Sequence, residues 1–108
     1  MPVSAEFRDY VLAQLACLGH VTGRPMFGGV GIYLDGVFFA LIADDVVYFK
    51  VGDSNRSDYE AIGMKPFRPY RNKKTTMPYY EVPVSVLEDV DQLAVWGRKA
   101  YAVATRAR

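Results

Sequence analysis

The chain has 108 residues, of which 51% are hydrophobic, so it can bury the core of one domain spanning residues 1–108. Its 13 basic and 12 acidic side chains give a net charge of +1, which argues against a polyanion-binding protein that works through bulk charge. A single cysteine excludes an internal disulfide and a four-cysteine metal site.

The N-terminal segment has the pattern of an amphipathic helix. Ser4 is a favourable N-cap residue, and Gly19 stands where helices commonly end. Between them, apolar residues recur at helical spacing: Phe7, Val11, Leu15 and Leu18. We therefore expect a first helix that buries one face.

An antiparallel meander is expected between Thr22 and Val51, where β-branched and aromatic residues replace the helical period. Asp35-Gly36 separates two apolar runs, which is the strongest short-range signal of a hairpin, and Asp44-Asp45 marks the next turn. These turns predict three or four strands, among them Val30–Leu34, Val37–Ala43 and Val46–Val51.

The second half of the chain alternates between helical and extended patterns. Asn55–Ile62 has the composition of a short helix, and Met77–Val82 that of a strand. Ser85 and Glu88 form a capping box that predicts the start of the last helix. The expected fold class is therefore α+β: a helix, a meander of three or four strands, a short helix, one more strand and a last helix.

The inferred strand register places apolar side chains on both faces of the sheet. A two-residue turn at Asp35-Gly36 pairs Leu34 with Val37 and Ile32 with Phe39. The two longer helices can cover one face, and the other would remain as an apolar patch of the kind that marks an interaction site. This candidate interface consists of Ile32, Leu34, Val37, Phe39 and Leu41. We expect a homodimer to bury it; in the alternative, the proline-rich segment after the second helix folds across it and leaves a monomer.

The segment Lys65–Lys74 is basic and contains no acidic residue. Its positive charges are Lys65, Arg68, Arg71, Lys73 and Lys74. Phe67 and Tyr70 are interleaved with them, and this combination can bind nucleic acid through phosphate contacts and base stacking. The near-neutral chain and the prolines favour a solvated loop whose two aromatic rings pack inward. A nucleic-acid-binding domain that uses these five cations is the alternative function.

We expect no catalytic residue, no metal site and no cofactor. The glycines of Gly28-Gly29-x-Gly31 lead into a strand rather than opening a helix, which favours a structural role over phosphate binding. Cys17 and His20 lack the further ligands that zinc requires. The acidic residues stand in turns and first helical turns, where local backbone effects account for them.

A cytoplasmic location without membrane contact is expected. The N-terminus carries Glu6, Arg8 and Asp9 where a signal peptide has its apolar core. The longest apolar run, Val37–Ala43, is far shorter than the roughly 20 residues of a membrane helix.

Short blocks of aromatic, glycine and charged residues follow one another along the chain. The most specific are Arg24-x-Met26-Phe27-Gly28-Gly29-x-Gly31-x-Tyr33 and Tyr48-Phe49-Lys50-Val51. The others are Gly36-x-x-Phe39-Ala40-x-Ile42, Gly63-x-x-Pro66-Phe67, Tyr79-Tyr80-x-x-Pro83 and Leu87-Glu88-Asp89-x-Asp91-x-Leu93-x-x-Trp96. In this order they resemble the N-terminal domain of the TfoX/Sxy family over about residues 4–104. Proteins of this family regulate bacterial competence for DNA uptake.

The resemblance implies a two-layer fold, similar to secretion-chaperone-like domains, with an antiparallel five-stranded sheet. Together with the three expected helices this gives the order α-β-β-β-β-α-β-α. It supplies no catalytic residues. The family's regulators act with a cyclic-AMP receptor protein at competence promoters, and they carry a second, helical domain before which this sequence ends. We therefore expect a stand-alone N-terminal domain. It would be a small, non-enzymatic, cytoplasmic protein–protein interaction module of the transcription or competence regulator type, with a transcription factor as partner.

Overall fold

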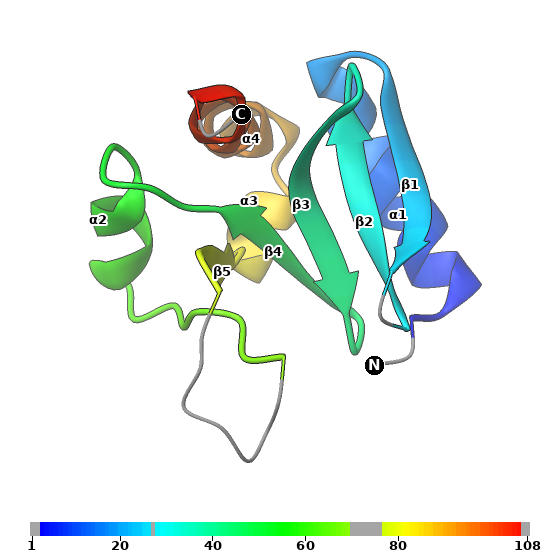
Figure 1. The fold of residues 1–108 in the computed structure, drawn as a ribbon, viewed down its shortest axis with the longest axis horizontal. Coiled ribbons are helices and arrows are strands. Elements are labelled where there is room, and N and C mark those ends of the chain that lie inside the picture. The colour runs from blue at the N-terminus through cyan, green and yellow to red at the C-terminus, as the bar shows by residue number, and fades with distance from the viewer. Residues whose placement is uncertain (1–2, 27, 70–76, 107–108) are drawn as a thin grey trace.

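The computed structural model describes residues 3–26, 28–69 and 77–106. Its five-stranded antiparallel sheet has the order β1-β2-β3-β4-β5, so neighbours in space follow the chain (Figure 1). The strands are β1 Val21–Met26, β2 Gly29–Leu34, β3 Val37–Ala43, β4 Val46–Lys50 and β5 Tyr79–Glu81. The helices are α1 Ala5–Leu15, α2 Arg56–Glu60, α3 Val84–Leu87 and α4 Val90–Arg106, with a 3₁₀ turn η1 at Ala16–Leu18. The predicted α+β meander is confirmed.

The main core lies between the sheet and helices α1 and α4, which pack on the same side of it (Figure 1). Phe39 of β3 is fully buried there, with its ring centroid 5.9 Å from that of Phe49 and 6.3 Å from that of Tyr101 on α4. Helix α4 also approaches η1 closely, because a β-carbon at Gly97 would stand only 2.8 Å from Leu18 Cδ1. This side of the sheet is therefore closed within one chain.

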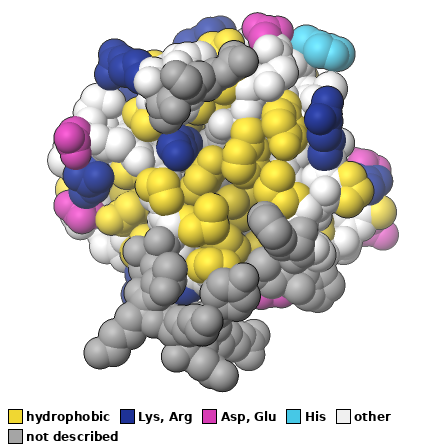
Figure 2. All heavy atoms as spheres, viewed as in Figure 1, with side chains coloured by type: hydrophobic (Ala, Val, Ile, Leu, Met, Phe, Trp, Pro, Cys, Tyr) yellow, Lys and Arg dark blue, Asp and Glu magenta, His cyan; other side chains and the backbone are white. Residues whose placement is uncertain are grey.

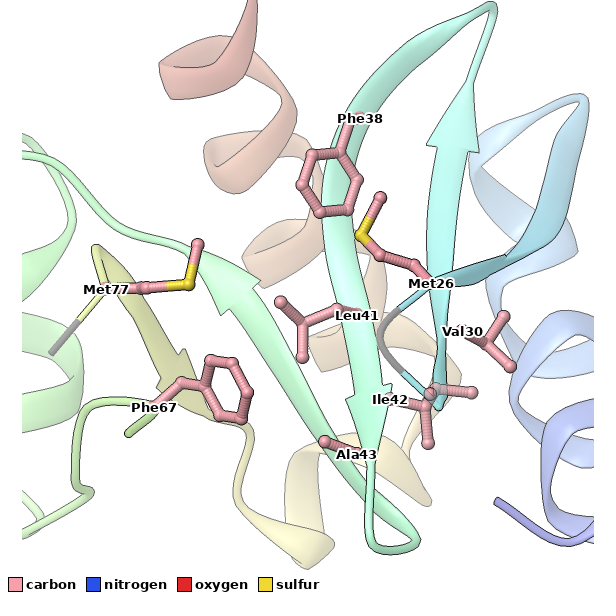
Figure 3. Close-up of a pocket in the computed structure, with 9 residues that line it drawn as sticks. Met26, Val30, Phe38, Leu41, Ile42, Ala43, Phe67 and Met77 are labelled. Carbon is pink, nitrogen blue, oxygen red and sulfur yellow. The ribbon is translucent and has the colours of Figure 1, made fainter. Parts of the chain in front are cut away.

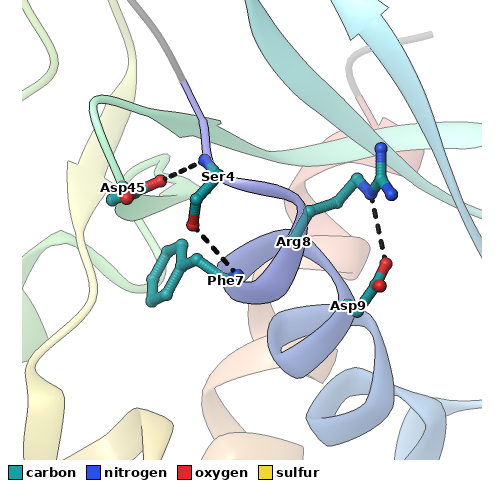
Figure 4. Close-up of polar contacts among 5 residues, drawn as sticks. All are labelled: Ser4, Phe7, Arg8, Asp9 and Asp45. Atoms are coloured by element: carbon teal, nitrogen blue, oxygen red, sulfur yellow. Dashed lines mark hydrogen bonds and ion pairs between the residues drawn. The ribbon is translucent and has the colours of Figure 1, made fainter.

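The start of α1 is fixed by its own cap and by a distant turn. The Ser4 hydroxyl accepts a hydrogen bond from the backbone N–H of Phe7 at 3.2 Å, as expected of an N-cap (Figure 4). The backbone N–H of Ser4 in turn donates to Asp45 Oδ1 at 2.9 Å. Asp45 belongs to the β3–β4 turn, so this bond holds the helix start against the end of a hairpin.

Both predicted hairpin turns are present. Asp35 and Gly36 have φ of 51° and 81°, and Asp44 and Asp45 have φ of 52° and 57°. Positive φ at both central residues is the pattern of a type I′ turn, whose twist matches that of the flanking strands. Aspartate tolerates this backbone region better than most side chains, which explains why it serves at three of the four positions.

The strand register departs from the predicted one at a β-bulge in β3. Leu34 pairs with Val37 and Tyr33 with Phe38, as expected, but Ile32 pairs with Ala40 rather than with Phe39. Phe39 is therefore an extra residue on its strand, and the alternation of faces is interrupted there. Phe39 and Ala40 both lie in the main core, and beyond them Ile42 joins that core while Leu41 turns to the opposite face.

The C-terminal helical region is two helices rather than the single one expected from Ser85 and Glu88. Helix α3 ends at Leu87, and α4 begins after Asp89. Asp89 Oδ1 accepts from the backbone N–H groups of Asp91 and Gln92, at 3.1 and 3.2 Å, and Asp89 Oδ2 accepts from the Gln92 side chain at 2.9 Å. Asp89 thus caps α4, and the described residues form four helices, not three.

Each outer edge of the sheet carries a proline. Pro25 lies within β1, the first edge strand. At the other edge, residues 65–67 run alongside β5, since Phe67 N donates to Tyr79 O at 2.7 Å and Glu81 N donates to Lys65 O at 3.0 Å. Between those two bonds, Pro66 has no N–H to offer, and such prolines block the addition of further strands. Within the described ranges, every helix is too short or too polar to cross a lipid bilayer.

Candidate interaction surface on the open sheet face

The side of the sheet turned away from α1 and α4 carries a second apolar cluster, and we call this side the open face. Figure 2 shows it as a continuous band of hydrophobic side chains with Lys and Arg beside it. None of the described residues in this cluster belongs to a helix: Leu41, Ala43, Phe67 and Tyr79 are buried, and Phe38, Tyr48 and Met77 are partly buried. Arg24, Tyr33 and Lys50 lie at its margins.

Aromatic rings on the open face are in contact across three strands. The centroid of Phe38 is 5.4 Å from that of Tyr33 on β2 and 5.4 Å from that of Tyr79 on β5. A cation stands over each outer ring, with Arg24 Cζ 4.9 Å from the centre of the Tyr33 ring and Lys50 Nζ 5.1 Å from that of Tyr79. The apolar centre of this face is thus flanked by two positive charges.

A cavity of about 130 Å³ opens in this face (Figure 3). The residues that line it are all apolar: Met26, Gly29, Val30, Phe38, Leu41, Ile42, Ala43, Phe67 and Met77. Two of them, Val30 and Ile42, also belong to the main core on the other side of the sheet. The volume is close to the ~150 Å³ of an apolar cavity that holds benzene. The cavity therefore suits a group of the size of one large apolar side chain.

Gly31 leaves space for the side chain of Met26, which lines this cavity. A β-carbon on Gly31 would be 3.0 Å from Met26 Cε and 3.3 Å from Phe38 Cε1. In the strand pairing, the bulge places Gly31 opposite Leu41. Because Gly31 has no side chain, Met26 and Phe38 can approach each other on the open face.

Burial alters the acidity of two phenols on the open face. Desolvation, and secondarily the charge of Tyr33, raises the pKa of Tyr79 to about 12. Burial also raises the pKa of Tyr48, with smaller contributions from the carboxylates of Glu81 and Asp44. Both side chains are neutral at physiological pH and act as apolar surface with a polar tip.

The structure corrects the candidate interface. Four of its residues, Ile32, Leu34, Val37 and Phe39, lie in the main core under the helices, with at most 5% of their surface exposed. Leu41 alone lies on the open face, because the bulge reverses the alternation after Phe39. These four side chains are buried in the folded chain, so a second copy cannot contact them. The homodimer stays a prediction, but this patch cannot be its interface.

The basic segment is described only in part. Lys65 and Arg68 are exposed, while Arg71, Lys73 and Lys74 lie outside the described residues. Phe67 is buried, with its ring centroid 4.8 Å from that of Tyr48, so this ring packs inward as predicted. Tyr70 also lies outside the described residues.

The proline-rich segment contributes Phe67 to the open face, whereas it was expected to fold across the face that carries Ile32 and Phe39, which the helices cover instead.

The described residues bring together no three metal-ligating side chains of the His, Cys, Asp or Glu type. Cys17 is exposed on the helical side of the molecule.

Sequence reasoning missed the cavity itself. Met26, Phe67 and Met77 come from three separate segments, and only the folded chain brings them together. The available signal was the apolar second face of the hairpin, which Tyr33 and Phe38 share.

Comparison with known proteins places the chain in a family. The family described as TfoX N-terminal domain matches residues 13–104, which is most of the sequence. The chain belongs to the TfoX N-terminal domain family. The matched region spans all five strands, so the open face belongs to the family domain.

This TfoX N-terminal domain is also similar to part of a longer protein. DNA transformation protein TfoX1 of Aliivibrio fischeri (strain ATCC 700601 / ES114) is 32% identical to it over 85 residues. The match covers 69% of this chain and 40% of the relative, so the chain spans less than half the length of the protein it resembles.

Proposed function

We propose that this TfoX-family domain is a non-enzymatic, cytoplasmic protein–protein interaction module that takes part in transcription or competence regulation. The observation that carries the proposal is the open face, where an apolar surface with its own cavity lies outside the helical layer. Apolar surface of this kind on a small domain commonly marks a binding site for another protein. The printed name of the relative, a DNA transformation protein, supports the regulatory setting.

Isolation of the bound partner from cells tests this function. The full chain, carrying an affinity tag at one end, would be expressed at its native level and purified after mild crosslinking. We expect a transcription factor to be recovered in stoichiometric amount. Recovery of no protein in such an amount, or turnover of a metabolite by the purified chain, would refute the proposed function.

Nucleic-acid binding through Lys65, Arg68, Arg71, Lys73 and Lys74 is the second candidate. The exposure of Lys65 and Arg68 favours it, whereas the burial of Phe67 removes one of the two rings expected to stack on bases. A binding measurement with single-stranded and double-stranded DNA at two salt concentrations decides between the two, since phosphate contacts weaken steeply as salt rises.

A further inference from the structure

The cavity on the open face selects the chemistry of its occupant. Its lining side chains offer no hydrogen-bonding partner, from Met26 and Phe38 on one side to Phe67 and Met77 on the other. A nucleobase placed there would lose the hydrogen bonds of its polar edges to water, at a large free-energy cost. A leucine, methionine or phenylalanine side chain has no such hydrogen bonds to lose, and a cavity of about 130 Å³ has room for one apolar group of this size.

Positive charge predominates around the cavity. Arg24 and Lys50 flank the aromatic rings, and Lys65 and Arg68 are exposed beside Tyr48 and Phe67. None of these four cations forms an ion pair within the part of the chain that the structure describes. Two carboxylates also lie near this face: Glu81 lines the same hollow as Lys65 and Arg68, and Glu81 and Asp44 both act on Tyr48. The surface is therefore complementary to an acidic partner.

The same charges disfavour a symmetric dimer through this face. A two-fold interface places the same patch of each copy against the other. Arg24 and Lys50 would then approach their own equivalents, and like charges brought together at an interface cost several kcal/mol in general. A different protein with carboxylates at matching positions avoids this repulsion.

We propose that the open face binds an acidic segment of a partner protein, which inserts one large apolar side chain into the cavity while its carboxylates meet Arg24, Lys50, Lys65 and Arg68. This inference rests on the proposed function and specifies its surface. The inserted side chain acts as the anchor of the interface, and the surrounding charges set orientation and association rate.

The test selects peptides without assuming a partner. The full chain, immobilised, would be presented with random peptides displayed on phage. The selected peptides would then be synthesised and their affinities measured by fluorescence anisotropy, with single-stranded oligo(dT) as a parallel probe. The surface variant is the double substitution Arg24→Glu with Lys50→Glu. The control for a change of charge is Arg98→Glu, at an exposed position of helix α4 on the other side of the sheet. Ala43→Leu fills the cavity, with circular dichroism as the check on folding.

We expect selected peptides that are acidic and contain one large apolar residue. Their affinity should fall about tenfold or more in the Arg24→Glu/Lys50→Glu variant and stay unchanged in Arg98→Glu. Replacing the apolar residue of the peptide by serine should abolish binding. A folded Ala43→Leu variant should also bind weakly; if it does not fold, the charge variants and the serine peptide still decide the proposal.

Other outcomes overturn the proposal in distinguishable ways. Selection of basic peptides, of none, or of peptides unaffected by the surface variant refutes this surface but leaves the proposed function intact if a cellular partner is recovered. Oligo(dT) binding that is lost in the surface variant assigns the face to nucleic acid. Light scattering that finds a dimer which the surface variant dissociates assigns it to a second copy. Failure to recover any cellular protein refutes the proposed function itself.

Discussion

The side chain of Met26 lies over Gly31 on the neighbouring strand, so closely that a β-carbon on Gly31 would be 3.0 Å from Met26 Cε. The two residues are five positions apart in the chain but belong to adjacent strands of one hairpin. Because Gly31 has no side chain, Met26 can lie beside Phe38, and both residues line the cavity on the open face.

The first prediction tests this contact by a double-mutant cycle. Gly31→Val should lower the free energy of unfolding by about 1–3 kcal/mol, because the added atoms meet Met26 and Phe38. In a Met26→Ala background, Gly31→Val should lower the free energy of unfolding by a smaller amount. Some loss should remain, because the added atoms still meet Phe38. Urea unfolding of the four proteins measures the coupling; additive effects would contradict the contact.

The second prediction concerns the β2–β3 turn. Gly36 has φ of 81° with open space around it, so any effect of a side chain there arises from the backbone. Gly36→Val should lower the free energy of unfolding by about 1 kcal/mol or more, whereas Gly36→Asn should cost much less, since asparagine tolerates positive φ. Equal losses in both variants would point to a clash instead of backbone strain.

The third prediction is a stabilising substitution. The hydroxyl of Tyr59 is buried without a hydrogen-bond partner among the described residues, and its ring packs against Trp96 with centroids 4.7 Å apart. Tyr59→Phe should raise the free energy of unfolding by about 1 kcal/mol, because it removes an unsatisfied polar group and keeps the ring. Tyr10→Phe, at a residue with 40% of its surface exposed, is the control and should change little.

The fourth prediction concerns alkaline pH. The folded protein raises the pKa of Tyr79 from its ordinary 10.0 to about 12, so the fold favours the neutral phenol. The resulting stability is fully present below pH 10 and is lost as the pH rises toward 12. Between these values, the wild type should lose stability faster than Tyr79→Phe. Tyr48 and Tyr59 titrate in both proteins, so their contributions cancel from the difference; parallel curves would contradict the shift.

The fifth prediction concerns acid pH and the start of α4. Hydrogen bonds from the Gln92 side chain and backbone hold the pKa of Asp89 below its ordinary 3.8. The stability contributed by the carboxylate is present above pH 3.8 and is lost as the pH falls through the lower folded value. Asp89→Ala should lower the urea midpoint at neutral pH, and its difference from the wild type should close in acid. Asp89→Asn keeps a capping oxygen and should lower the midpoint less.

Local signals were sufficient for the hairpins and for the first helix. Asp35-Gly36 favours positive φ, and the Ser4 hydroxyl can accept a hydrogen bond from a nearby backbone N–H. These local properties are enough to predict a hairpin turn and an N-cap. The family resemblance added the number of strands. The start of α4 was misplaced because Ser85 and Glu88 have the pattern of a capping box, whereas Ser85 lies inside the short helix α3 and Asp89 caps α4.

The candidate surface was misassigned for a single reason. Strict alternation is the correct rule for a regular strand, but one extra residue at Phe39 exchanges the faces of everything after it. Leu41 was thereby placed with Ile32 in the prediction, whereas the fold separates them onto opposite sides. Nothing in Phe38-Phe39-Ala40 signals such a bulge, because phenylalanine favours strands and alanine is only mildly disfavoured there.

The prolines at the two sheet edges restrict how another molecule can attach. With Pro25 in β1 and Pro66 beside β5, neither border presents a full set of amide donors for an incoming strand. A binding partner must then be recognised by side chains on the open face. The backbone of that partner does not need to be extended, and it can be helical or irregular. The same arrangement disfavours the edge-to-edge pairing of strands between copies of the chain that leads to fibrils, although the open face is apolar.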